Sequence, residues 1–115
     1  MKWKVLLFSF ALVGCSSQIT PMLSDDVDAW QSYGEQRASD GYIVQSEKKL
    51  LAYAISGEVT SEQYQAYLNG YQLGKEEYCQ QDARMLGRLG KPYRGICNDI
   101  DPFFQSDYDN AYRLW

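Results

Sequence analysis

The residues best suited to chemistry are four basic side chains that lie within one short, glycine-rich stretch. They are Arg84, Arg88, Lys91 and Arg94. Glycine leaves backbone N–H groups free to point at a ligand, and an arginine guanidinium donates paired hydrogen bonds to a carboxylate or phosphate. The stretch could therefore bind an anion. The alternative is a solvated loop whose charges balance the acidic remainder of the chain.

The acidic residues that follow could suggest a calcium site. Asp99 and Asp101 alternate along the chain, as do Asp107 and Asp109. An EF-hand loop also needs a glycine at its turn and a closing glutamate, and the segment around Asp101 lacks both. Aspartate followed by Pro102 is instead typical of a helix N-terminus. We therefore expect no metal and no other cofactor.

Catalysis has little support in the sequence. The chain contains no histidine, which excludes the Ser-His and Cys-His nucleophile pairs. It also lacks a G-x-S-x-G nucleophile elbow and a P-loop. Paired carboxylates could cut a glycan, but no aspartate or glutamate stands in such a motif. We expect that the protein is not an enzyme.

The N-terminal segment has the pattern of a secretory signal peptide. Lys2 and Lys4 precede an apolar run at 5–13, and this run is too short to span a bilayer. The run leads into Leu-Val-Gly-Cys at positions 12–15, which resembles the lipobox of bacterial lipoproteins. The alternative is a plain secretory signal with an incidental cysteine.

The lipobox resemblance implies that residues 1–14 are removed and that Cys15 carries a diacylglycerol and an N-acyl chain. Each buried CH₂ group contributes roughly 0.8 kcal/mol, so several acyl chains would anchor the protein to the membrane permanently. Ser16 in place of an aspartate favours, by the same resemblance, sorting to the outer membrane, and we expect the domain to face the periplasm. Residues 15–25 would then form a lipidated tether, and 26–115 the periplasmic domain.

The remaining cysteines, Cys79 and Cys97, form an even pair once Cys15 is acylated. An oxidising periplasm favours a disulfide between them. By the chain-entropy model, such a short loop contributes about 3 kcal/mol to stability. The alternative is a redox-active or metal-binding pair, although the wide spacing is unlike a C-x-x-C motif.

The length and charge of the chain limit its architecture and partners. The 115 residues carry 11 basic and 15 acidic side chains, a formal net charge of −4, which becomes −6 when Lys2 and Lys4 leave with the signal. This length suits one small domain. Nucleic acid requires a basic face, so we expect no nucleic-acid partner.

The helix signals predict an all-α domain of about four helices with one glycine-rich loop held by the disulfide. Asp26 can cap a first helix, and Thr60 with Gln63 makes a capping-box pattern. No segment shows the sustained alternation of a strand. The predicted helices are 27–39, 46–55, 61–80 and 102 to the C-terminus, with an irregular segment over 87–97.

Aromatic residues interleave with small ones on each long predicted helix. The stripes contain Trp30, Tyr33, Gly34, Arg37, Ala38 and Gly41; Tyr64, Tyr67, Gly70, Tyr71, Gly74 and Tyr78; and Phe104, Tyr108, Ala111, Tyr112 and Trp115. This pattern predicts close helix crossings in which a small residue on one helix receives a ring from another. The alternative is an exposed surface on which a ligand stacks.

The same residues resemble the proteobacterial lipoproteins of the domain-of-unknown-function family 2799. The resemblance lies in Trp30-x-x-Tyr33-Gly34, Tyr64-x-x-Tyr67-x-x-Gly70-Tyr71-x-x-Gly74 and Gly87-x-x-Gly90-x-Pro92-Tyr93-x-Gly95-x-Cys97. The chain departs from that pattern at Ala111, where glycine is more frequent, and at 55–56, where relatives carry a further cysteine. The resemblance implies a lipoprotein and supports the Cys79–Cys97 pairing. It implies no catalytic residue.

Together these observations predict a non-catalytic outer-membrane lipoprotein, anchored through Cys15, that serves as an adapter or accessory protein of an envelope assembly. Its partner would be another envelope protein. The alternative is a module that binds peptidoglycan or an anionic envelope ligand through the basic stretch. An exposed apolar groove would favour the adapter, and a concave site that converges on Arg84, Arg88 and Arg94 would favour the binding module.

Overall fold

The computed structural model describes residues 22–113, which form helices and contain no β-strand beyond one isolated bridge. The elements are α1 (Val27–Ser39), α2 (Glu47–Leu50), the 3₁₀-helix η1 (Leu51–Tyr53), α3 (Ser61–Tyr78), α4 (Ala83–Arg88) and α5 (Phe104–Tyr112). The all-α prediction is confirmed. The predicted signal peptide 1–14 and the lipidation site Cys15 lie outside the described residues.

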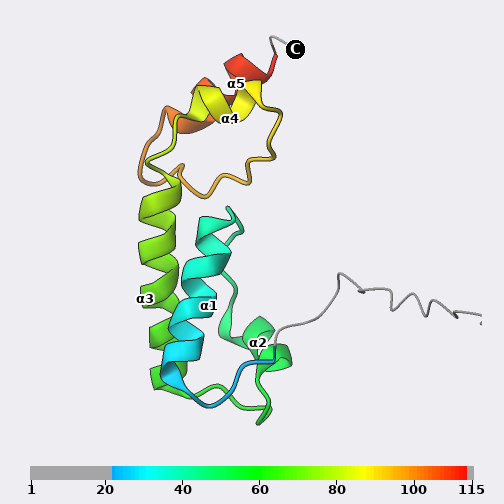
Figure 1. The fold of residues 1–115 in the computed structure, drawn as a ribbon, viewed down its shortest axis with the longest axis vertical. Helices are drawn as coiled ribbons and strands as arrows, with labels where there is room; N and C mark the ends of the chain where they lie inside the picture. Colours follow the sequence, from blue (N-terminus) through cyan, green and yellow to red (C-terminus); the bar gives the residue numbers. More distant parts are fainter. Residues whose placement is uncertain (1–21, 114–115) are drawn as a thin grey trace, which may run out of the picture.

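The two longest helices, α1 and α3, run in the same direction side by side (Figure 1). Gly70 lies against the backbone of Gln31, and Gly74 against that of Glu35, so positions on the two helices advance together. The connecting segment 40–60 returns the chain to the end at which α1 begins. At the other end, α4 and α5 form a second helix pair.

The predicted starts of α1 and α3 are confirmed by their caps. The Asp26 side chain accepts a hydrogen bond from the N–H of Asp28 at 3.0 Å. Thr60 and Gln63 form a complete capping box, with bonds of 2.9 and 3.1 Å between side chain and backbone. Such caps satisfy N–H groups that the first helical turn leaves unpaired. The third predicted helix ends two residues early, at Tyr78.

The helix predicted over 46–55 is shorter than expected. It forms α2 and continues only as the 3₁₀ turn η1, because Ala54 is extended and pairs with Leu23. The N–H of Leu23 donates to the Tyr53 carbonyl at 2.7 Å, and the N–H of Ile55 donates to the Leu23 carbonyl at 3.1 Å. This pairing attaches the start of the described chain to the domain and ends the helix.

The two-turn helix α4 begins between the third predicted helix and the segment predicted to be irregular, where no element was predicted, and it extends into that segment as far as Arg88. The Asp82 side chain accepts from the N–H of Arg84 at 2.9 Å and starts the helix, and Gly90, with a φ of 66°, follows its end. The last helix begins at Phe104 rather than at Pro102, because the Asp101 side chain caps a preceding turn by accepting from the N–H of Phe103.

The glycines on α1 and α3 allow the two backbones to touch. A Cβ atom added at Gly34 would lie 2.1 Å from the carbonyl oxygen of Tyr67, and one added at Gly70 would lie 1.9 Å from that of Gln31. The predicted close crossing is therefore present, but these glycines receive a backbone carbonyl and not a ring. Only Gly41, beyond the end of α1, faces a ring among these positions, that of Tyr78.

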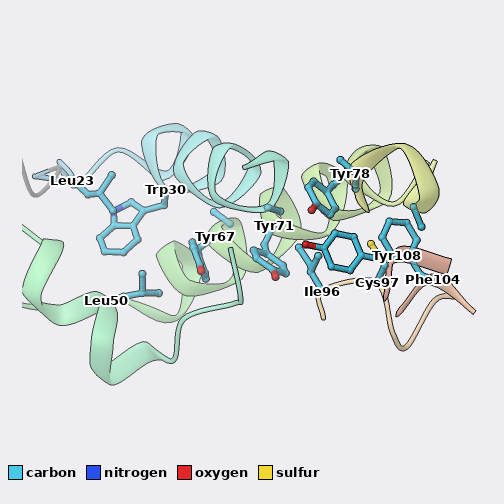
Figure 2. Packing of buried hydrophobic residues seen from close by; sticks show 14 of the residues in the cluster. Leu23, Trp30, Leu50, Tyr67, Tyr71, Tyr78, Ile96, Cys97, Phe104 and Tyr108 are labelled. Carbon is cyan, nitrogen blue, oxygen red and sulfur yellow. The ribbon is translucent and has the colours of Figure 1, made fainter. Parts of the chain in front are cut away.

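Most residues of the aromatic stripes form the core, as predicted, but Tyr112 is 52% exposed, and Trp115 lies outside the described residues. Figure 2 shows the buried side chains in a row from Leu23, Trp30 and Leu50 at one end to Phe104 and Tyr108 at the other. Tyr67, in the middle, is fully buried. Large rings supply the buried area that this chain lacks in aliphatic side chains.

The tyrosine hydroxyls attach the two connecting segments to the helices. Tyr71 donates to the carbonyl of Tyr42 at 2.9 Å, and Tyr108 donates to the carbonyl of Lys91. The buried Gln45 accepts from the Tyr33 hydroxyl at 2.8 Å, and its own N–H donates to Tyr67 at 2.9 Å. Burial raises the pKa of the Tyr33 and Tyr67 hydroxyls, which keeps them protonated.

Candidate functional site

The basic stretch is closed into a loop by a disulfide between Cys79 and Cys97, as predicted. Cys79 follows the end of α3, and Cys97 is fully buried. The N–H of Cys97 donates to the Tyr93 hydroxyl at 2.9 Å. Nearby, the Lys75 ammonium lies 2.7 Å from the Asp99 carboxylate. These contacts fix both ends of the segment that carries the predicted anion-binding residues.

Two of the four predicted residues, Arg84 and Arg88, lie together. They are four positions apart on α4 and therefore share one face of the helix. With Asp107, Asn110 and Ala111 of α5 they line an open pocket of about 220 Å³. The guanidinium of Arg84 lies 3.7 Å from the carboxylate of Asp107.

The other two predicted residues, Lys91 and Arg94, lie in a different pocket. It has a volume of about 210 Å³ and shares no residue with the first. The residues that line it include Ser39 and Asp40 at the end of α1. Arg94 also lies over the ring of Tyr42, 4.4 Å from its centroid, where it forms a cation–π contact. The structure therefore divides the basic stretch into two pairs.

An open apolar pocket adjoins the end of α4. Leu89, Gly90, Tyr112 and Arg113 line about 550 Å³. Leu89 is 56% exposed and Tyr112 is 52% exposed. Met85, four positions before Leu89, is also exposed, so both side chains lie on the same face of α4. Sequence reasoning missed this surface because its Met-x-x-x-Leu spacing crosses into the segment predicted to be irregular, where no helix was expected.

The acidic residues considered for calcium have structural partners instead. Asp99 pairs with Lys75, whose hydrogen bond lowers the pKa of the Asp99 carboxyl, and Asp101 caps a turn. Within residues 22–113, no three His, Cys, Asp or Glu side chains are grouped so that they could hold a metal ion. Nor does this part of the chain contain a helix with the length and apolar character needed to cross a membrane.

The chain matches the model of a known protein family. The family model described as protein of unknown function (DUF2799) matches residues 29–113. The chain belongs to this family. The DUF2799 match extends from the first turn of α1 to the residue after α5, and it includes both disulfide cysteines and both pockets that the α4–α5 pair lines. Neither the curated proteins nor the solved structures provide a match.

Proposed function

We propose that this protein is a non-catalytic lipoprotein of the outer membrane, anchored at Cys15, whose periplasmic domain serves as an adapter in an envelope assembly. The N-terminal pattern supports the anchor. The disulfide between Cys79 and Cys97 supports an oxidising compartment, because such bonds form and persist there.

The observation that carries the adapter role is the apolar pocket beside α4. Leu89 and Tyr112 offer apolar surface, and Arg113 adds a positive charge at the same pocket. Partner proteins commonly anchor a large apolar side chain in such a pocket. The partner's contact segment would therefore carry an apolar residue next to an acidic one.

The test is crosslinking of the tagged full chain in its own outer membranes, followed by mass spectrometry. We expect one stoichiometric protein partner. The Leu89→Lys variant should no longer recover this partner, because a buried ammonium group would take the place of an apolar contact. Leu73→Lys on α3 is the matched control, since Leu73 is 50% exposed and Leu89 56%. Equal recovery by both variants would refute the contact, and recovery of no protein would refute the adapter role.

The anchor has its own measurement. The intact mass of the purified protein should correspond to a chain that begins at Cys15 and carries acyl chains. Cys15→Ser should leave residues 1–14 attached and move the protein from the membrane fraction to the soluble fraction. A chain cleaved elsewhere, with an unmodified Cys15, would contradict the anchor.

A second role is supported by the pocket of Arg84 and Arg88, which could bind an anionic envelope ligand such as peptidoglycan or a lipid headgroup. Two guanidinium groups that face the same open space provide the donors that such a ligand needs. Lys91 and Arg94 lie in the other pocket, so this role falls to the first pair.

A further inference from the structure

We propose that the pocket between α4 and α5 binds the terminal carboxylate of a short peptide, and that Asp107 competes with this ligand for Arg84. The proposal deepens the second role above and rests on it. It reduces the four basic residues to one pair, and it assigns a part to two residues, Asp107 and Asn110, that the sequence did not connect with anion binding.

The donors of the pocket come from both helices. Arg84 and Arg88 offer guanidinium N–H groups from α4, and Asn110 offers a side-chain amide from α5. Within residues 22–113, the guanidinium of Arg88 has no ion-pair partner. It is therefore available to a carboxylate that enters from solvent.

Asp107 already places a carboxylate at the edge of the pocket. Its oxygen lies 3.7 Å from the Arg84 nitrogen, beyond the range of about 2.7–3.2 Å for a hydrogen bond to N–H. Arg84 is thus attracted by Asp107, but its donors are not saturated by it. A ligand carboxylate at hydrogen-bond distance would displace this loose pair.

The charge balance favours a carboxylate over a phosphate. Arg84, Arg88 and Asp107 together leave one positive charge in the pocket, which a monoanion neutralises. A dianion gains at most about twice the attraction of this single charge, whereas the cost of removing it from water rises with the square of its charge. Phosphate dianions are therefore disfavoured relative to a carboxylate.

The size and wall of the pocket favour a chain end. A volume of about 220 Å³ holds a carboxylate and the atoms next to it. Ala111 is an apolar wall beside the donors, and it suits the small side chain of a terminal residue such as alanine. The peptides of peptidoglycan are the class of envelope ligand that carries such free carboxylates.

The experiment is an NMR titration of the full, disulfide-bonded chain, followed at the side-chain amide of Asn110. The probes are the dipeptide Ala-Ala, its C-terminal amide and inorganic phosphate. We expect saturable shifts with the free acid, weaker binding of phosphate and no binding of the amide. Tighter binding of phosphate, or equal binding of acid and amide, would overturn the assignment.

Three variants test the roles of the residues, and all leave the buried core unchanged. Arg88→Gln should weaken Ala-Ala binding roughly tenfold, because it removes a charge-assisted hydrogen bond. Asp107→Asn should strengthen binding about fivefold, because it removes the competing charge. Lys48→Gln on α2 makes the same change in net charge as Arg88→Gln and should have no effect.

An Asp107→Asn variant with unchanged or weaker affinity would refute the competition. Absence of Ala-Ala binding to the wild type would overturn the carboxylate site. It would leave the adapter role intact, because that role is tested separately by the loss of the crosslinked partner in Leu89→Lys.

Discussion

Gly70→Ala is the most direct test of the contact between α1 and α3. An isolated helix would gain stability from this change, because alanine has a higher helix propensity than glycine by about 1 kcal/mol. In the folded protein, however, the added Cβ would lie 1.9 Å from the carbonyl oxygen of Gln31, where ordinary contacts begin at 3.4 Å. The two effects oppose each other, so the sign of the result identifies the stronger one.

The magnitude follows from what has to move. The atom in the way belongs to the backbone of Gln31, so no side-chain rotation relieves the clash and the helices must separate locally by about 1.5 Å. A gap of 0.5–1 Å already forfeits a quarter to a half of the attraction between facing atoms. Overpacking lowers the free energy of unfolding by about 1–3 kcal/mol when neighbouring side chains can adjust. Here we expect a loss at or above the upper end of this range, because the neighbour is backbone. When the gain in helix propensity is subtracted, the net decrease in the free energy of unfolding is about 2–3 kcal/mol.

The assay is thermal and urea unfolding of the oxidised full chain. A loss of this size lowers the melting temperature of a domain of this length by about 10–20 °C. Asn69→Ala, on the exposed side of α3, is the control for propensity and should be neutral or slightly stabilising. Gly57 has a φ of 75° and no neighbour within 4 Å of an added Cβ atom. Gly57→Ala should therefore show only the strain of alanine in a left-handed backbone conformation, about 1 kcal/mol. If Gly70→Ala is as stable as the wild type, the backbones are not in contact and the reasoning fails.

Three further predictions concern the disulfide and the tyrosines. Cys97→Ser should reduce the free energy of unfolding by about 3 kcal/mol, as should reductant on the wild type; an unchanged urea midpoint would show that the bond stabilises nothing. Burial raises the pKa of Tyr71 to about 12 from 10.0. The contribution of its protonated hydroxyl to the free energy of unfolding is therefore complete below pH 10 and is lost as the pH rises towards 12. The urea midpoint of the wild type should therefore fall between pH 10 and 12, and that of Tyr71→Phe should fall less. Equal pH dependence of the two midpoints would show that Tyr71 does not cause the loss. Gln45→Leu should cost about 1–2 kcal/mol, because it leaves the Tyr33 hydroxyl without its acceptor. Tyr33→Phe in the same chain should recover part of that loss, and a double-mutant cycle without coupling would contradict the hydrogen bond.

The elements that could be predicted are those whose signals are local. The cap at Asp26 and the capping box of Thr60 and Gln63 lie within one turn of the helices that they start, so both starts are correct. The helix α4 also has a local cap, at Asp82, but Gly87 made its segment resemble a loop. That glycine serves a contact distant in sequence, since a Cβ there would lie 2.5 Å from the carbonyl oxygen of Tyr108.

The candidate site could be predicted only in part for the same reason. Four basic residues within one stretch indicate an anion site, and two of them line a common pocket. The residues next to these arginines in sequence do not indicate that Arg94 lies over the ring of Tyr42 while Arg88 faces α5. The acceptors of the tyrosine hydroxyls are equally non-local, since Tyr71 bonds a carbonyl 29 positions away.

The parallel direction of α1 and α3 determines where each end of the molecule is presented. Had the two helices formed an antiparallel hairpin, the chain would leave α3 beside the point where it enters α1. Because they are parallel, the chain enters at one end and continues into the α4–α5 pair at the other (Figure 1). The 18 residues of α3 span about 27 Å. The helix pair therefore acts as a spacer, and a ligand or partner bound by α4 and α5, as proposed above, would be kept that far from the point where the N-terminal segment joins the domain.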